Sequence, residues 1–159
     1  MIINIKELTN YRAVLFEDLA KMMIRKRNKN NFIFMTRRFD DLDEVVRKYN
    51  LDVSSVNHDI MQLLESNFKT IDLIEFKLNN FRERIVDDLA FYEVKTKSHN
   101  NKMLSDMCVK SYETYKVLMD EGFQVMTVFF VFFENWRCSF NMHPMDLKNF
   151  KVYSRFTPV

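Results

Sequence analysis

Along most of the chain, hydrophobic residues recur at intervals of three and four, which is the spacing of one face of an α-helix. In the first segment the pattern begins after Thr9 or Asn10, either of which can cap a helix, and runs to about Asn28. The positions expected to face the core are Val14, Leu15, Leu19, Met22 and Met23. The pattern therefore predicts a first helix whose opposite face is polar and basic.

A second, shorter helix is predicted after Asp40 or Asp41, which can cap it, and continues to about Asn50. Its inward positions would be Leu42, Val45, Val46 and Tyr49. The preceding segment, residues 30–39, reads "NNFIFMTRRF" and is compatible with a loop, a short strand or the end of a turn. We leave these three alternatives open for that segment.

The longest predicted helix opens at Ser54 or Ser55 and covers about Val56 to Val94, a span without Gly or Pro. Its apolar positions are spaced by threes and fours, close to a heptad repeat: Ile71, Ile74, Leu78, Phe81, Ile85, Leu89 and Tyr92. A break near residues 67–70 is compatible with this pattern. A helix of this length is expected to span a domain or to pair with another long helix.

After a polar loop at residues 95–101, a further helix is predicted from about Met103 to Glu121. Its apolar face would hold Leu104, Met107, Cys108, Tyr115, Leu118 and Met119. Gly122 stands where a left-handed C-terminal cap is expected.

The segment at residues 123–140 is the most hydrophobic of the chain, and its Val and Phe content also suits a β-strand. A lone strand among helices would leave its backbone groups unpaired, so we favour a buried central helix. One broad face of that helix would hold Met126, Phe129, Phe130, Phe133, Trp136 and Phe140. Pro144 is then expected to start a final short helix.

Composition supports a helical interpretation. The 159 residues include 47% apolar residues but only one Gly and two Pro, and hairpins and phosphate-cradling loops depend on Gly. No internal repeat or linker divides the chain. The sequence thus predicts an all-α fold, a single domain over residues 1–159 built as a bundle of about five helices.

Charge is distributed unevenly, although the net charge is only +2. Residues 1–38 carry a net charge of +6, residues 39–93 one of −7 and residues 94–159 one of +3. Residues 21–38 contain seven bases and no acid: Lys21, Arg25, Lys26, Arg27, Lys29, Arg37 and Arg38. Such a cluster is typical of a protein that contacts several phosphates, or of one that balances acidic residues elsewhere.

The first alternative is the leading hypothesis for function: a non-enzymatic protein that binds the backbone of RNA or DNA through these seven bases. Phe32, Phe34 and Phe39 lie among them and can stack on unpaired nucleobases. The second alternative is an interaction or assembly protein whose basic and acidic regions pair between subunits. A Gly-poor chain rich in Phe, Met, Asn and Lys is also typical of small viral proteins, including accessory proteins.

Motifs for catalysis or cofactor binding are absent from the sequence. His58, His99 and His143 have no metal-ligand spacing with one another or with Cys108 and Cys138. The adjacent pairs Asp40–Asp41 and Asp87–Asp88 are interpreted as helix caps or solvated faces. We therefore expect no enzyme, no cofactor, no metal and no small-molecule substrate. The N-terminus resembles no signal peptide and no span is long enough to cross a membrane, so an intracellular location is expected.

Overall fold

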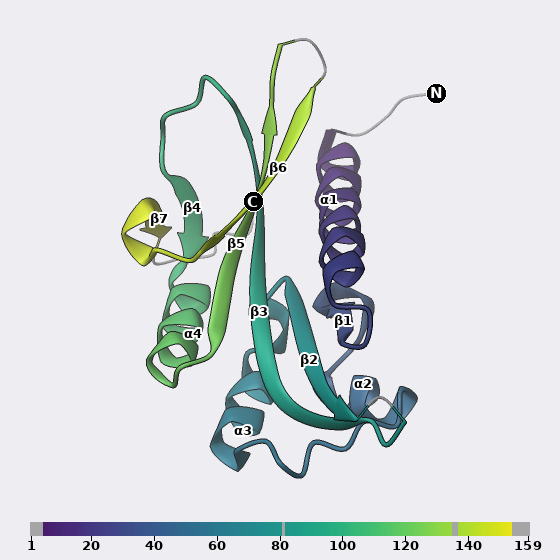
Figure 1. Ribbon diagram of the computed structural model, residues 1–159. Coiled ribbons are helices and arrows are strands. Elements are labelled where there is room, and N and C mark those ends of the chain that lie inside the picture. The colour runs from purple at the N-terminus through teal and green to yellow at the C-terminus, as the bar shows by residue number, and fades with distance from the viewer. Residues whose placement is uncertain (1–4, 81, 135–136, 154–159) are drawn as a thin grey trace.

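The computed structural model describes residues 5–80, 82–134 and 137–153. Its architecture is mixed α/β, with 38% helix and 36% strand, so the predicted all-α bundle of about five helices is wrong. A five-stranded sheet stands between helices on both of its faces (Figure 1).

The strand order in this sheet is β1-β2-β3-β5-β6. The strands are β1 (Phe32–Met35), β2 (Leu73–Asn80), β3 (Ile85–Ser98), β5 (Gln124–Phe132) and β6 (Cys138–Pro144). Neighbouring strands are antiparallel, except that β3 and β5 are parallel. A small second sheet pairs β4 (Ser105–Cys108) with β7 (Phe150–Tyr153) in parallel.

Helix α1 (Ile5–Arg27) lies on one face of the sheet, where Ala20 and Ile24 pack against residues of β1, β2, β3 and β5. The other face is covered by α2 (Leu42–Lys48), α3 (His58–Ser66) and α4 (Val109–Asp120). Three short 3-10 helices connect these elements: η1 (Thr36–Arg38), η2 (Phe68–Thr70) and η3 (Leu147–Asn149).

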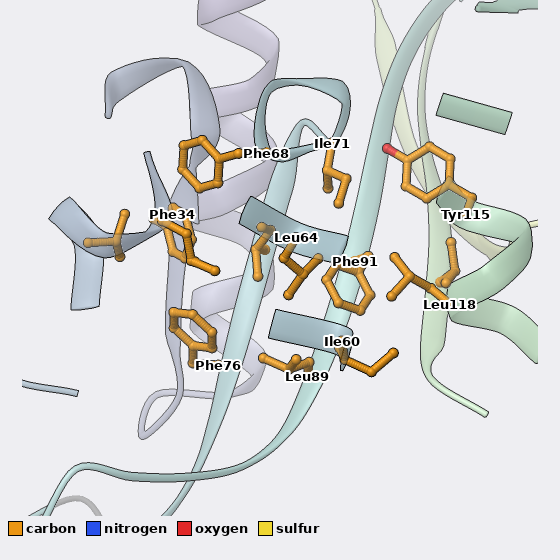
Figure 2. Packing of buried hydrophobic residues seen from close by; sticks show 14 of the residues in the cluster. Phe34, Ile60, Leu64, Phe68, Ile71, Phe76, Leu89, Phe91, Tyr115 and Leu118 are labelled. Carbon is orange, nitrogen blue, oxygen red and sulfur yellow. The ribbon is translucent and has the colours of Figure 1, made fainter. Parts of the chain in front are cut away.

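The larger hydrophobic core lies between the sheet and helices α2, α3 and α4. Figure 2 shows Phe34, Phe76 and Phe91 of the strands together with Ile60 and Leu64 of α3. Tyr115 of α4 closes one side of this core, and its side chain is completely buried (Figure 2). Because both faces of the central strands are covered, their residues are apolar on both sides.

Some predicted elements are confirmed. A first helix is present, although it begins at Ile5 rather than after Thr9 or Asn10. The short helix α2 is capped by Asp41, whose side chain accepts a hydrogen bond from the Glu44 amide. Gly122 follows α4 with a φ of +88°, the left-handed conformation expected of it.

The predicted core face of the first helix is wrong. Its buried positions include Glu17, Ala20 and Ile24, whereas four of the five predicted apolar positions are largely exposed: Leu15, Leu19, Met22 and Met23. Helical spacing alone could not distinguish two neighbouring stripes, one of which includes a buried carboxylate.

The predicted long helix over residues 56–94 is also wrong. The segment forms α3, η2 and the antiparallel strands β2 and β3. The hairpin turns without Gly, because Arg84 itself takes a positive φ of 54°. Residues such as Ile74 and Leu89 lie at heptad spacing in the sequence but point to the same face of two paired strands.

The Phe-rich segment is not a central helix but strands β5 and β6. The objection that a strand would lack partners fails, because β5 has a partner on each side: β3 on one and β6 on the other. Phe133 is 41% exposed, and Trp136 lies outside the described residues. Pro144 ends β6 instead of starting a helix. None of the described helices is both long and apolar enough to cross a membrane.

Candidate functional site

Strands β2 and β3 separate where β2 begins, at Asp72 and Glu93. We call this place the fork. Leu73 of β2 pairs with Tyr92 of β3, and β3 then continues to Ser98, pairing with β5 on its other side. Helix α1 lies beside the edge of β3 that β2 leaves open (Figure 1). Backbone and side-chain groups that a further strand would cover are therefore available at this fork.

Asp72 lies at the fork, immediately before β2. The antiparallel register places it opposite Glu93, one step beyond the Leu73–Tyr92 pair, and directly opposed side chains in such a pair are separated by about 5 Å at their Cβ atoms. The Val94 amide donates a hydrogen bond of 2.8 Å to Asp72 Oδ2, so the carboxylate replaces the missing strand. The Thr36 amide donates to the Asp72 carbonyl oxygen at 3.1 Å and docks η1 against the same point.

Glu17 of α1 faces the fork and is 4% exposed. Arg37 of η1 reaches it with two hydrogen bonds: Nε donates to Glu17 Oε1 at 3.0 Å, and the second guanidinium nitrogen donates to Oε2. This is the bidentate arrangement in which a guanidinium matches a carboxylate. The pair fixes η1 against α1 and places one cation beside the buried Glu17 and near the partly buried Asp72.

Glu93 and Lys95 stand on the same face of β3, because residues two apart on a strand share a face. Lys95 Nζ is 3.5 Å from Glu93 Oε1 and donates a hydrogen bond of 2.6 Å to the Asp106 carbonyl oxygen in β4. The Tyr115 hydroxyl donates to Glu93 Oε2 from α4. Glu93 is 7% exposed, and its carboxylate is held by one neutral and one cationic donor.

Thr127 of β5 is the register partner of Glu93, so its side chain projects on the same face of the sheet. It is buried, and its hydroxyl is the one buried side-chain polar atom of the described residues that has no hydrogen-bond partner. An unsatisfied buried hydroxyl costs about 1–3 kcal/mol. The Thr127 hydroxyl is thus a polar group on the same face of the sheet as the Glu93 carboxylate.

Ionisation of the three acids is suppressed by their surroundings. Burial, and then repulsion from Asp72, raises the pKa of Glu17 to about 7, although Arg37 opposes the shift. The same two causes raise the pKa of Glu93 to about 8. Burial raises the pKa of Asp72 as well. Near neutral pH the site thus holds more acidic groups than it can ionise at once, which is a recurrent property of functional sites.

A groove of about 280 Å³ beside the fork lies between α1 and the open edge of β3. Its walls include Arg12, Phe16 and Glu17 from α1, and Val94, Lys95 and Thr96 from β3. Among the described residues, no three His, Cys, Asp or Glu side chains are arranged to hold a metal ion. A cation that takes two protein carboxylates, water and substrate phosphates, as Mg²⁺ commonly does, requires only Asp72 and Glu93.

The seven predicted nucleic-acid-binding residues do not form one surface, and only four of them come together. Lys21, Arg25, Lys29 and Arg38 line a pocket of about 440 Å³ at the outer edge of β1, together with Arg84. We call this the basic pocket. Arg37 belongs instead to the fork, where it pairs with Glu17, and Arg27 lies over the Phe140 ring. Lys26 is exposed elsewhere on α1.

The aromatic residues among these bases are mainly structural. Phe34 and Phe39 belong to the core, whereas Phe32 is only partly buried at the wall of the basic pocket. The acidic pairs noted in the sequence lie outside the fork: Asp41 caps α2, and Asp87 and Asp88 are exposed on β3. Both cysteines are free thiols.

Sequence reasoning missed Glu17, Asp72, Glu93 and Lys95. For Asp72, Glu93 and Lys95 the signal is the pair of apolar runs "IDLIEF" and "LAFYEVKTK", which carboxylates interrupt at positions that should be buried. The signal becomes readable only when both runs are assigned to strands, because only the hairpin register brings Asp72 opposite Glu93. Comparisons of the chain with known protein families, with curated proteins and with solved structures gave no match.

Proposed function

We propose that this protein hydrolyses phosphodiester bonds in nucleic acid, using a divalent cation held by Asp72 and Glu93. The observation that carries the proposal is the carboxylate pair at the fork, with Lys95 on the same face and an unpartnered Thr127 hydroxyl beside it. Burial raises the pKa of all three acids, and repulsion from Asp72 raises it further at Glu17 and Glu93, so the cluster favours a ligand of high positive charge. The sequence alone favours a non-enzymatic binder; this cluster makes an enzyme the better proposal.

The chemical fit favours a hard cation. The side-chain atoms at the fork that could ligate a metal ion are oxygens, and oxygen ligands suit Mg²⁺ or Mn²⁺ rather than zinc or copper. When bound, such an ion supplies a Lewis acid for a phosphate oxygen and lowers the pKa of water. Asp72 and Glu93 would hold the ion through their carboxylate oxygens.

The protein's own groups would perform the remaining steps. Lys95 stands beside Glu93 and would bind a non-bridging phosphate oxygen, whose charge grows as water attacks. Glu17, on the groove wall with a pKa of about 7, would accept the proton of the attacking water, and the leaving oxygen of the P–O bond that breaks would take a proton from solvent water. Arg37 orients the Glu17 carboxylate and limits the upward shift of its pKa.

Nucleic acid is the proposed substrate because basic side chains, Lys and Arg, lie around the fork. Arg12 and Lys95 line the groove, and the basic pocket continues along α1. Backbone contacts of this kind bind polyanions without reading their sequence. The expected intracellular location is part of this proposal, since it is where nucleic acid is met.

The test is cleavage of labelled single-stranded DNA, duplex DNA and RNA in Mg²⁺, Mn²⁺ or EDTA. We expect products with either metal and none in EDTA. Asp72→Asn should reduce cleavage by about 100-fold or more, while Asp87→Asn, the same change at an exposed position of β3, should retain activity. Equal activity of the wild type and Asp72→Asn would indicate a contaminating nuclease and refute the proposal.

The alternative, an assembly protein whose basic and acidic regions pair between subunits, gives a different result. It predicts an oligomeric state that changes with salt, measured by light scattering, and no cleavage under any condition. That outcome would replace the hydrolase proposal.

A further inference from the structure

The basic pocket is a built recess and not merely a charged surface. Its walls come from three parts of the chain: the continuous stretch from α1 through β1 and η1 to Phe39, the segment of Tyr49 and Leu51 after α2, and the β2–β3 hairpin with Leu78 and Arg84. The loop is fixed by the buried Glu75, whose Oε2 accepts hydrogen bonds from the Asn28 and Asn31 side chains at 3.3 and 3.2 Å. Asn31 Oδ1 also accepts a bond from the Leu78 amide.

Arg84 is brought to the pocket from the hairpin turn. Its guanidinium donates to the Tyr49 carbonyl oxygen, and its own carbonyl oxygen accepts a bond of 2.9 Å from the Asp52 amide. The turn is thereby tied to the segment after α2. The strained positive φ of Arg84 is maintained by these two contacts.

Most of the positive charge of the pocket is not balanced by neighbouring acids. Its lining includes five bases and no Asp or Glu: Lys21, Arg25, Lys29, Arg38 and Arg84. Among the ion pairs of the described residues, only Lys21 of these five has an acidic partner, Asp18 at 3.4 Å. The pocket therefore favours an anion, and several guanidinium groups favour phosphate.

An aromatic surface adjoins these bases. The rings of Phe32 and Tyr49 both line the pocket, with centroids 4.2 Å apart, and both are only partly buried. Aromatic rings next to Lys and Arg side chains are an arrangement that binds single-stranded nucleic acid, since each ring can stack on an unpaired nucleobase. A duplex, with its nucleobases paired and stacked inside, cannot use such a surface.

The pocket is aligned with the carboxylate fork along α1. Glu17, Lys21 and Arg25 follow one another at intervals of four, so they lie on one side of the helix. Eight residues of helix span about 12 Å. One strand of nucleic acid rising about 3.4 Å per nucleotide would cover this distance in roughly three to four nucleotides.

We propose that the basic pocket is a subsite for an unpaired nucleotide of the substrate strand, which it holds a few nucleotides from the fork. The bases bind its phosphates, and Phe32 and Tyr49 stack on its nucleobase. This inference rests on the proposed function and adds a substrate class to it: nucleic acid with a single-stranded segment, such as an overhang or an unpaired strand.

The experiment measures binding separately from cleavage, using Asp72→Asn in EDTA and a fluorescent 12-nucleotide single strand. The double variant Arg25→Gln/Arg38→Gln removes two pocket charges, and Lys26→Gln/Lys116→Gln removes two exposed charges elsewhere. We expect the pocket variant to bind about tenfold more weakly and the control less than threefold. The slope of log affinity against log salt should fall by roughly 0.7 for each phosphate that the pocket variant no longer neutralises.

A second variant, Tyr49→Leu, tests the stacking surface while retaining apolar bulk. It should weaken binding of the single strand at least about fivefold and leave binding of a blunt duplex unchanged. Equally weakened binding of the single strand, the duplex and heparin would overturn the subsite, because it describes a general polyanion surface. So would equal binding by the pocket and control variants.

The two proposals fail in different ways. If cleavage depends on metal and Asp72 but the pocket variant binds like its control, only the subsite is overturned. If the pocket variant no longer binds while no substrate is cleaved, the hydrolase is overturned, and the pocket becomes the site of a single-strand-binding protein.

Discussion

The carboxylate fork and the basic pocket lie about two helical turns apart along α1, and they are built on opposite principles. At the fork, acids are buried among one another, so their charge is costly and their ionisation suppressed. In the pocket, bases such as Arg25 and Arg38 are exposed and remain hydrated. Ionisation of the acids at the fork therefore lowers the stability of the fold, whereas the charges of the pocket carry no such cost.

The difference also concerns rigidity. Each acid of the fork is held by specific donors: Arg37 for Glu17, the Val94 amide for Asp72, and Tyr115 for Glu93. The bases of the pocket extend from fixed backbone but have long side chains that adapt. A fixed site suits chemistry at one phosphorus atom, and an adaptable one suits a strand of any sequence.

The largest expected effect follows from removing one ligand of the proposed cation. Asp72→Asn should reduce metal-dependent cleavage by about 100-fold or more, because charge at the reacting phosphate would no longer be neutralised. Binding of a single strand in EDTA should persist, since the pocket is separate. Joint loss of both activities in a folded variant would show that the two regions are one site.

The second prediction concerns stability and pH. Glu93 and Glu17 have pKa values of about 8 and about 7 in the folded protein against an ordinary 4.5, so between pH 4.5 and 8 the folded state binds more protons than the unfolded state. Stability should therefore fall as pH rises through this window and level off above it. The free energy of unfolding measured in urea at several pH values tests this.

The variant Glu93→Gln isolates one carboxyl from the rest of the chain. The change in the free energy of unfolding between pH 4.5 and pH 8 should be smaller in this variant than in the wild type by roughly 2–4 kcal/mol, because the amide cannot ionise. Mg²⁺ should stabilise the wild type above pH 8, by up to about 2.7 kcal/mol at a hundredfold excess over Kd, and leave Asp72→Asn unchanged. A stability that rises with pH would contradict the buried cluster.

A smaller effect is expected from Arg37, which touches the fork but holds no substrate. Its guanidinium keeps the pKa of Glu17 lower than burial alone would. Arg37→Gln should therefore shift the acid limb of the activity profile to higher pH, while leaving the maximal rate within about tenfold. Arg38→Gln, the neighbouring change on η1, provides the control and should not shift the profile.

The two regions also differ in how far the sequence predicts them. Seven bases without an acid are visible directly, and the structure places four of them in one pocket. The fork depends on the pairing of Asp72 with Glu93 across a hairpin, which the sequence disguises. In strands that are buried on both faces, apolar and polar residues no longer alternate. Apolar residues that happen to be spaced by three and four then resemble the pattern of a helix.

Local signals were reliable where local physics decides the outcome. The Asp41 cap and the left-handed Gly122 depend on neighbouring backbone groups alone, and both were predicted correctly. The prediction fails for strand β5, because the sequence pattern also predicts a helix for its partner β3. One wrong assignment thus led directly to the other.

The smallest expected effect tests the pocket's side of the comparison. Arg25→Gln and Arg38→Gln should each change the free energy of unfolding by no more than about 0.5 kcal/mol, because exposed charges without a partner contribute little to the fold. Urea unfolding of both variants, with Lys26→Gln as the matched control, measures this. A destabilisation above about 1 kcal/mol at Arg25 or Arg38, absent from the control, would mean that these bases support the fold. The charges of the pocket would then affect stability as the acids of the fork do, and the proposed difference between the two regions would be wrong.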